Sequence, residues 1–273
     1  MDRRLTPATP RIAHSSLKGR VEVPVYTEGT PMRVALPVAD LLRAPKGARE
    51  RQLLLGEGFT VIDRNEGHAF GFAAKDGYCG WLADAALSRG PVPTHWVASP
   101  GTHLYPEPKV QAAEICALSL GAEIAITAQH GIWAETTQGF VPACHILPLG
   151  QHLTDPVAVA ESLLNTPYLW GGNSRAGMDC SGLVQLAFGA CGITLPGDSD
   201  LQQAAGHDIA ADAAPRRGDL IFWKGHVAII VDDTRLIHAN GHTMSVAHED
   251  TQACIARILA QGGGPVTHRR RVL

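Results

Sequence analysis

The sequence has no uninterrupted apolar run of the ~18 residues that would cross a membrane. It also has no excess of positive charge, because 23 lysines and arginines stand against 26 aspartates and glutamates, for a net charge of −3. Nucleic-acid binding needs a basic stripe, and the short basic run at residues 269–271 is better interpreted as a solvated tail or a strand end. The sequence therefore predicts neither a membrane nor a nucleic-acid partner, and it leaves the oligomeric state open.

Signatures of metal sites and disulfide frameworks are missing as well. The six cysteines, at positions 79, 116, 144, 180, 191 and 254, form no C-x-x-C pair, and the 13 histidines form no H-E-x-x-H pattern. Scattered single cysteines are typical of reduced thiols in a reducing compartment. We therefore predict no metal and no cofactor.

The amino-terminal residues lack the apolar segment of a secretory signal. Arg3 and Arg4 resemble the charged start of such a signal, but Pro7 and Pro10 stand where its apolar run would lie. We therefore expect the protein to act in the cytoplasm, with a removed export signal as the open alternative. At 273 residues, of which 45% are apolar and 18% charged, the chain has the composition of a globular protein of one to three domains.

The sequence does contain a glycine-rich stretch at residues 167–182, which reads PYLWGGNSRAGMDCSG. Apolar residues then recur at helical spacing until Gly192, which predicts a helix with Cys180 in its first turn. The free N–H groups of that turn are expected to shift the thiol toward the nucleophilic thiolate. His226 and His238 can supply imidazoles that activate it. A buried structural cysteine is the alternative, and residue chemistry alone divides about evenly between the two.

Short apolar runs between turn signals predict an all-β amino-terminal half. The runs fall at residues 38–45, 51–62, 69–73 and 77–82, and then at 95–98, 102–106, 115–126, 131–135 and 139–142. This weak repeat, with a period of roughly 60 residues, predicts two small β-barrels in tandem. We expect three domains: residues 1–90 with the first barrel, 91–150 with the second, and 151–273.

The third domain opens with an N-cap and a first-turn proline, Asp155 and Pro156. The predicted helix that starts at Cys180 is the second of this domain, and a loop and a short helix follow it at residues 194–203. Strands are predicted at residues 219–223, 226–231 and 235–239. Helices followed by an antiparallel sheet predict an α+β fold.

Five motifs of this domain, in order, resemble the NlpC-type family of papain-like peptidoglycan cysteine peptidases. They are PYLWGG at 167–172, DCSGLVQ at 179–185, GDLIFW at 218–223, GHVAI at 225–229 and IHA at 237–239. The resemblance implies a papain-like catalytic domain, and the barrels before it are similar to the bacterial SH3-like domains of the dipeptidyl-peptidase VI type. The family cuts bacterial cell-wall peptides, often at the γ-D-glutamyl bond to a diamino acid.

The resemblance also implies catalytic roles. Cys180 is the nucleophile, and His226 is the base that takes its proton and returns it to the leaving amine. His238 is expected to orient His226, with His242 and His248 as alternatives for that position. The structural alternatives are a core histidine for His226 and a surface histidine at a strand end for His238.

Substrate contacts are implied by the same resemblance. Asp198 and Ser199 match a pair found in members that act on peptides with a free N-terminal L-Ala, and a carboxylate suits an ammonium group. Tyr168 would hold the oxyanion together with the Cys180 N–H. Asp179 and Ser181, beside the nucleophile, are further candidates for substrate contacts, and Trp170 is a groove wall or a core residue. Glu57 and Tyr78 of the first barrel are the last candidates, with a turn glutamate and a core tyrosine as the alternatives.

We therefore expect a cysteine endopeptidase that cleaves the γ-D-glutamyl–diamino acid bond of L-Ala-γ-D-Glu-diamino acid peptides during murein peptide recycling. One alternative is an exported hydrolase that acts on intact wall. Another is a wall-binding adaptor with an inactive enzyme domain, which the presence of Cys180, His226 and His238 disfavours. The sequence does not decide which diamino acid is preferred or what the second barrel binds.

Overall fold

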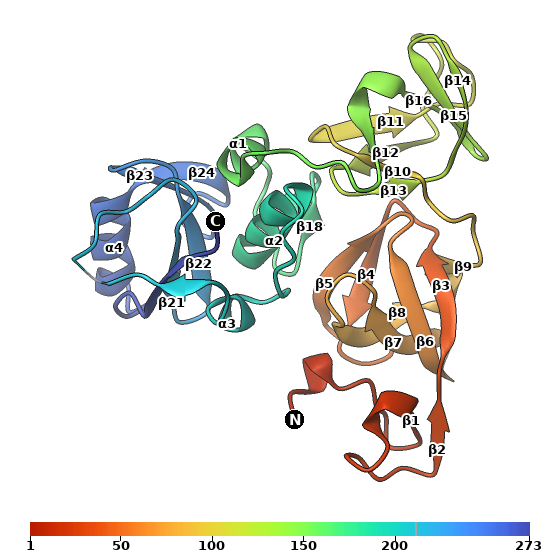
Figure 1. The fold of residues 1–273 in the computed structure, drawn as a ribbon, viewed down its shortest axis with the longest axis horizontal. Coiled ribbons are helices and arrows are strands. Elements are labelled where there is room, and N and C mark those ends of the chain that lie inside the picture. Colours follow the sequence, from red (N-terminus) through yellow and green to blue (C-terminus); the bar gives the residue numbers. More distant parts are fainter. Residues whose placement is uncertain (211) are drawn as a thin grey trace. The chain divides into compact units, whose positions relative to one another are not determined.

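The structure, a computed structural model, describes residues 1–210 and 212–273 and divides into two compact units, Met1–Leu149 and Gly150–Leu273 (Figure 1). The first unit is built from strands and 3-10 turns, and the four α-helices of the described residues all lie in the second. The predicted order, strands first and a mixed helix-and-sheet region after them, is confirmed at this level.

Seven antiparallel strands of the first unit pair in the order β5-β4-β8-β7-β6-β3-β9. They bury one larger apolar core and a smaller apolar cluster of Ile62, Phe70 and Cys79. Burial alternates along β4, where Ala39 and Leu41 are buried while Asp40 is exposed, as expected when one face of a sheet covers a core. Strand β3 was not predicted from the sequence, because Pro31 and Arg33 interrupt its apolar pattern. The strands are β3 (Thr30–Val34), β4 (Val38–Leu42), β5 (Arg49–Leu54), β6 (Gly58–Asn65), β7 (His68–Ala73), β8 (Cys79–Ala83) and β9 (Leu87–Ser88).

The residues before β3 form short pieces, in which β1 and β2 pair in parallel. The pieces are η1 (Arg3–Leu5), β1 (Ile12–His14), η2 (Ser15–Leu17) and β2 (Val25–Thr27), and a further turn, η3 (Asp84–Ala86), precedes β9.

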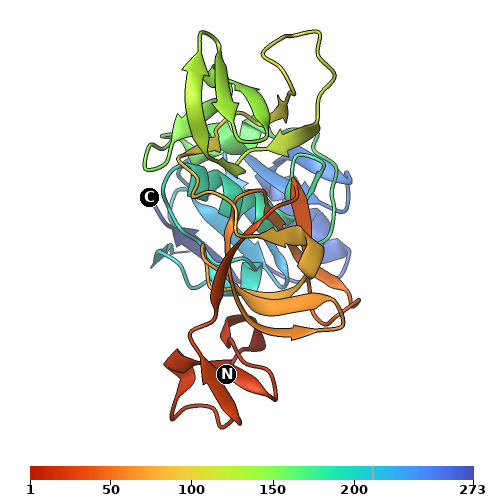
Figure 2. The same cartoon turned by 90° about the vertical axis from the view of Figure 1, so that its right-hand side faces the viewer.

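Residues 95–148 form three small antiparallel sheets, β13-β10-β17, β11-β12 and β14-β15-β16, the last seen as a yellow-green hairpin sheet in Figure 2. They share an apolar core that includes Val97, Leu118 and Val141, joined by Leu54 and Leu55 at the end of β5. The elements are β10 (His95–Val97), β11 (Gly101–Leu104), β12 (Cys116–Ser119), β13 (Glu123–Ile124), β14 (Ile126–His130), β15 (Trp133–Thr136), β16 (Gly139–Pro142), η4 (Ala143–His145) and β17 (Ile146–Pro148).

A buried ion pair links β5 to the turn between β7 and β8 within the seven-stranded sheet. Arg51 on β5 contacts Asp76 at 2.8 Å, and each side chain is only 3% exposed. The same guanidinium lies over the ring of Tyr78, with its carbon 5.2 Å from the ring centroid. Asp76 also accepts a hydrogen bond from the backbone N–H of Tyr78. The tyrosine is thereby held in the core, where it is 2% exposed.

The second unit contains a six-stranded sheet in the order β20-β25-β21-β22-β23-β24, with helices on either side of it (Figure 1). The strands are β20 (His207–Asp208), β21 (Leu220–Trp223), β22 (His226–Ile230), β23 (Arg235–Asn240), β24 (Ser245–Asp250) and β25 (His268–Arg271), and the hairpin β18 (Asn173–Ser174) and β19 (Gly177–Met178) stands apart from the sheet. The helices are α1 (Pro156–Ser162), α2 (Cys180–Ala190), α3 (Ser199–Gln202) and α4 (Thr251–Ala260).

Strand register determines which side chains share a face of this sheet. Trp223 lies opposite His226, Leu236 opposite Ile230, and Leu236 also opposite Glu249. Since side chains alternate along a strand, these residues and His238 all project from one face. Helix α4 packs on that face around Cys254, against Ile221, Ala228 and Leu236 among others.

The basic run at residues 269–271 belongs to β25, an inner strand between β20 and β21. Arg271 donates two hydrogen bonds to the buried carboxylate of Asp219. The strand interpretation is therefore correct, and the run is part of the fold rather than a solvated tail.

The Arg51–Asp76 pair leads to a prediction about stability. Replacing Asp76 with Ala leaves a buried guanidinium without its counter-charge, so the first unit should lose about 3–5 kcal/mol of unfolding free energy. The exposed Lys46–Glu66 pair, with side chains 72% and 58% exposed, is the control, and Glu66→Gln should cost less than about 1 kcal/mol. Native-state hydrogen exchange of first-unit amides measures both losses, and equal losses would contradict the argument.

Candidate active site

The position of Cys180 is fixed by the carboxylate of its neighbour Asp179. One oxygen of Asp179 accepts hydrogen bonds from the Gly182 N–H at 2.7 Å and the Ser181 hydroxyl at 3.0 Å, which makes it the N-cap of α2. The other oxygen accepts from the N–H of Gly171 at 2.9 Å. Gly171 has a φ of 71°, a conformation that favours glycine. The glycine loop and the helix start are thus held together, with Cys180 as the first residue of α2, as predicted.

The thiol of Cys180 is buried, with the residue 7% exposed. Burial raises the pKa of the thiol to about 12, and the neighbouring Asp179 carboxylate raises it further. Backbone N–H groups of Val227, Ser181 and Cys180 lower this pKa, but they do not outweigh burial. The prediction that the helix start shifts the thiol toward thiolate was therefore wrong for the substrate-free site. A neutral thiol needs a base that removes its proton during attack.

His226 is the first residue of β22, directly before Val227, whose N–H reaches the thiol. Its Nε2 lies 2.9 Å from Nδ1 of His238 on β23. Trp223 lies opposite His226 in the strand register, and the centroids of the two rings are 5.6 Å apart. Burial, and then His238, lower the pKa of His226 to about 3. The imidazole is therefore neutral and able to accept a proton at physiological pH.

The structure brings His238, which is 1% exposed, into contact with His226. Of the two alternatives, His248 has its Nε2 3.4 Å from Glu161, and His242 is exposed. Burial lowers the pKa of His238 to about 4, so this imidazole is neutral too. A neutral imidazole that is hydrogen-bonded to the base can hold its ring orientation, which is the role predicted for His238.

Tyr168 is partly buried on the loop before the helix, and it forms a bridge with Met178. Burial raises the pKa of its phenol to about 12, and repulsion from an ionised Cys180 thiol and from the Asp179 carboxylate adds to the shift. The hydroxyl therefore keeps its proton and can donate a hydrogen bond. Trp170 on the same loop is 69% exposed. It is not a core residue, and its role as a groove wall stays a prediction.

The loop that carries Asp198 and Ser199 is tied to the nucleophile helix. Gln202, which is fully buried, donates hydrogen bonds to the backbone oxygens of Ser181 at 3.0 Å and Pro196 at 2.9 Å. Gln185 donates to the oxygen of Leu195 at 2.9 Å. Neither glutamine was assigned a role from the sequence, although Gln185 ends one of the motifs and Gln202 stands in the predicted loop and short helix at residues 194–203. They connect the predicted amine-binding residues to the first turns of α2.

The other predicted contacts have structural partners. The Ser181 hydroxyl donates a hydrogen bond to the Asp179 carboxylate. Glu57 accepts hydrogen bonds from the backbone N–H of Leu54 at 3.1 Å and from Lys75 at 2.7 Å. Tyr78 is the core tyrosine described above. The structural alternatives for Glu57 and Tyr78 thus account for their contacts in the first unit. Substrate contacts of these four residues stay predictions.

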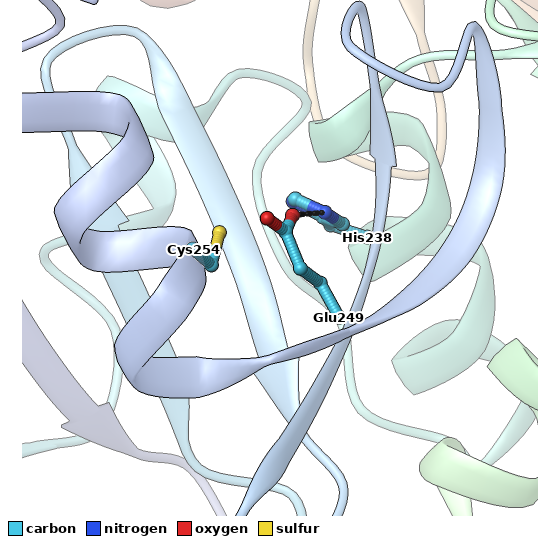
Figure 3. A group of neighbouring side chains, drawn as sticks. All are labelled: His238, Glu249 and Cys254. Atoms are coloured by element: carbon cyan, nitrogen blue, oxygen red, sulfur yellow. Dashed lines mark ion pairs between the residues drawn. The ribbon is translucent and has the colours of Figure 1, made fainter. Parts of the chain in front are cut away.

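One group of potential metal ligands was not foreseen. A His238 nitrogen, a Glu249 oxygen and the Cys254 sulfur lie within 4.8 Å of one another (Figure 3). However, Arg257 donates two hydrogen bonds to the same carboxylate, and burial raises the pKa of the Cys254 thiol to about 12. The site already contains a cation and a protonated thiol, and both oppose metal binding.

The site combines a buried thiol at a helix start, a neutral imidazole on the residue before Val227, whose N–H reaches that thiol, and a second imidazole hydrogen-bonded to the first. These groups are the ones that acyl transfer uses. The thiol can attack a carbonyl, His226 can carry the proton, and the N–H of Cys180 and the hydroxyl of Tyr168 can donate to a developing oxyanion. Such a site, on a sheet that follows the nucleophile helix, defines a papain-like cysteine peptidase domain.

Comparisons with known proteins identify two domains of the chain. A profile of the NlpC/P60 family matches residues 165–261, and a profile of the bacterial dipeptidyl-peptidase Sh3 domain matches residues 41–87. The chain therefore carries an NlpC/P60 domain in its second unit and a bacterial dipeptidyl-peptidase SH3 domain in its first. The predicted family and the class of a cysteine peptidase domain are confirmed. The second SH3-like barrel, at residues 91–150, stays a prediction.

Two similar relatives are gamma-D-glutamyl-L-lysine dipeptidyl-peptidases. That of Bacillus cereus is 27% identical over 234 residues, 70% of this chain and 67% of the relative. That of Bacillus subtilis is 29% identical over 181 residues, 60% of each chain. Dipeptidyl-peptidase 6 of Lysinibacillus sphaericus is 36% identical over 99 residues, 35% of this chain and 36% of the relative. The chain thus matches between about a third and two thirds of the length of these relatives.

Among solved structures, an NlpC/P60 family protein from Bacillus cereus has a TM-score of 0.76 at 21% identity, and the match covers 89% of this chain and 100% of that one. This similarity shows the fold. In the part of the chain that the structure describes, no helix has the length and apolar character needed to span a membrane.

The neutral histidine pair predicts an unusual acid limb of the pH profile. An imidazole with an ordinary pKa of 6.5 would be about 90% protonated at pH 5.5, and kcat/KM would fall about tenfold from its plateau. Because the pKa of His226 is lowered to about 3, kcat/KM should stay within about twofold between pH 7 and pH 5.5.

Stability must be followed in the same series. Histidines whose folded pKa is depressed stabilise the fold above their unfolded pKa, and this contribution is lost as the pH falls toward the folded value. Thermal unfolding at each pH therefore controls for loss of structure. A tenfold decline with an apparent pKa near 6.5, in a folded protein, would show that the base is not held neutral.

Cys180→Ala should abolish turnover without loss of the fold, because it removes the nucleophile but leaves the cap of α2 in place. Cys191, the C-cap residue at the other end of the same helix, provides the matched control. Cys191→Ala should keep near-normal turnover. Hydrolysis by Cys180→Ala at a near-normal rate, measured by mass spectrometry of the products, would remove Cys180 from the mechanism.

Proposed function

We propose that this protein is a cysteine peptidase that hydrolyses the γ-D-glutamyl–diamino acid bond of murein peptides with a free N-terminal L-Ala. The observation that carries the proposal is the buried Cys180 thiol at the start of α2, reached by the N–H of Val227, the residue that follows His226 in the hydrogen-bonded pair of His226 and His238. The dipeptidyl-peptidase SH3 match in the first unit, and the names of the relatives, support the peptide class.

The reaction follows from the geometry in two halves. As the Cys180 sulfur attacks the γ-glutamyl carbonyl, His226 takes the thiol proton, and the oxyanion is stabilised by the Cys180 N–H and the Tyr168 hydroxyl. His226 then returns the proton to the leaving amine of the diamino acid, which leaves a thioester. A water molecule, deprotonated by His226, hydrolyses the thioester and releases the peptide acid and the free thiol.

Selection for a free amino end is assigned to Asp198, with Ser199 beside it. Both side chains are partly exposed, on a loop anchored by Gln202 to the carbonyl next to the nucleophile. A carboxylate held near the groove pairs with the ammonium of L-Ala and gives an N-blocked peptide no counter-charge. A dipeptidyl-peptidase, the activity named for the relatives, likewise removes two residues from a free amino end.

We further propose that the reaction occurs in the cytoplasm, as a step in the recycling of wall peptides. All six cysteines are free, which suits a reducing compartment. The competing hypothesis of an exported hydrolase predicts release of peptide from intact wall. The hypothesis of an inactive adaptor predicts no turnover of any wall peptide, and the intact hydrogen bond between His226 and His238 disfavours it.

The free amine supplies the sharpest test. Breaking a charge pair by removing one partner is costly, and 2.7 kcal/mol already corresponds to about 100-fold in rate. N-acetylated L-Ala-γ-D-Glu-diamino acid peptide should therefore be cut at least ~100-fold more slowly than the free peptide, in kcat/KM measured by mass spectrometry. Both meso-diaminopimelate and L-lysine peptides should be used, since the relatives are named for lysine.

Asp198→Asn should slow cleavage of the free peptide and thereby reduce the ratio of kcat/KM on the free peptide to kcat/KM on the N-acetylated peptide. Asp200→Asn is the matched control, because it removes the same charge from an exposed position of the same short helix. The control should keep the full ratio. Equal kcat/KM on free and acetylated peptides, or release of peptide from intact sacculi, would support the exported hydrolase instead.

A further inference from the structure

The contacts behind the two histidines continue further into the second unit. Nε2 of His238 lies 3.2 Å from a carboxylate oxygen of Glu249, and the histidine side chain is fully buried (Figure 3). Arg257 on α4 donates from Nε and Nη2 to the two oxygens of the same carboxylate, at 2.8 and 2.7 Å. The carboxylate is thus fixed in place by a bidentate pair that is itself mostly buried, with side chains 18% and 19% exposed.

The sheet explains why these groups meet. Ala247 lies opposite His238, and Glu249 is two residues further along the same face. The small alanine leaves room for the longer glutamate to reach diagonally to the imidazole, within the distance that diagonal pairs span. Helix α4 covers this face and brings Arg257 to the carboxylate.

The charge of Glu249 decides where His238 carries its proton. Both histidines are neutral at physiological pH, so each has one N–H and one lone pair. The pKa of Glu249 is lowered to about 2, and the largest cause is the hydrogen bonding from Arg257. The carboxylate is therefore charged. A negative oxygen 3.2 Å from Nε2 attracts an N–H there and repels a lone pair, although the angle of this contact is not that of a hydrogen bond.

The proton positions then follow along the contacts. With its proton on Nε2, His238 has a lone pair on Nδ1, and that atom lies 2.9 Å from Nε2 of His226. His226 must therefore carry its own proton on Nε2 and donate it to His238. The remaining nitrogen of His226, Nδ1, is left with the lone pair that a base needs.

We infer that Glu249, held by Arg257, is a positioning residue that sets the tautomers of His238 and His226 so that Nδ1 of His226 is the free base for the Cys180 thiol. The inference rests on the proposed function for its effect on turnover, but the proton positions themselves exist in the substrate-free protein. Glu249 also faces the positive charge that develops on the histidine pair when the thiol proton is taken, and it stabilises that charge.

Kinetics separate positioning from mere stabilisation of the fold. Glu249→Met removes the charge and the acceptor at similar size, and kcat should fall at least about tenfold with KM changed less than about threefold. Arg257→Met keeps the carboxylate beside His238 and should lower kcat less. The double variant Glu249→Met/Arg257→Met leaves no unpaired ion, so thermal stability should recover relative to Glu249→Met while kcat stays low.

A matched control comes from a carboxylate–guanidinium pair on the same sheet. Asp232 pairs with Arg235 at 2.7 Å at the turn between β22 and β23, with both side chains exposed. Asp232→Asn keeps the turn-capping oxygen and should leave kcat unchanged. If the double variant regained normal kcat along with its stability, Glu249 would be only a structural partner of Arg257.

Nuclear magnetic resonance of the ¹⁵N-histidine-labelled full chain reads the tautomers without any substrate. Long-range ¹H–¹⁵N spectra, assigned with His226 and His238 variants, should show the proton on Nε2 of both residues, and Glu249→Met should add the Nδ1–H form. A wild-type spectrum with Nδ1–H on either residue would overturn the inference. Because this readout needs no turnover, a failure of the proposed peptidase activity leaves it interpretable.

Discussion

The carboxylate of Asp179 joins the two pieces of chain on which the site depends. It caps α2 through Gly182 and holds the glycine loop through Gly171, so the nucleophile and the loop with Tyr168 keep a fixed relation. Gly182 itself must lack a side chain, because a Cβ there would lie 2.5 Å from the carbonyl oxygen of Gly172. The motif around Cys180 is thus a structural device first, and its chemistry follows from where it places one sulfur atom.

Burial then sets the electrostatics of the site. The thiol and both imidazoles are each neutral because burial penalises their charged forms, and the fixed charge in contact with the histidine pair is that of Glu249, which Arg257 balances. A neutral thiol–imidazole pair stores no charge before substrate binds. In the proposed reaction, charge appears only as the proton moves from the thiol to the histidine pair, whose far end faces the Glu249 carboxylate. Under that proposal the carboxylate stabilises the transition state rather than the ground state.

The sequence sufficed for those parts of the site that local patterns encode. Helical spacing after the glycine loop placed Cys180 at a helix start, and the histidines on apolar runs proved to lie on neighbouring strands. It failed where burial or register decides. The thiol pKa depends on how deeply α2 packs, and Glu249 meets His238 only through the pairing of β23 with β24, a strand that was not predicted. Helix α4, which supplies Arg257, was likewise not predicted.

The contacts of Glu57 and Asp198 bear on which of them would select the free amino end of the peptide. In the first unit, Glu57 already accepts from Lys75 and from the Leu54 N–H, so it has a counter-charge and a turn to cap before any ligand arrives. Asp198 is the N-cap residue of α3, on a loop whose anchor is the buried Gln202. A carboxylate already paired with a lysine would have to give up that partner to bind an ammonium group. The proposed selection of a free amino end is therefore assigned to Asp198 of the catalytic unit, on the loop that Gln202 ties to α2, rather than to Glu57.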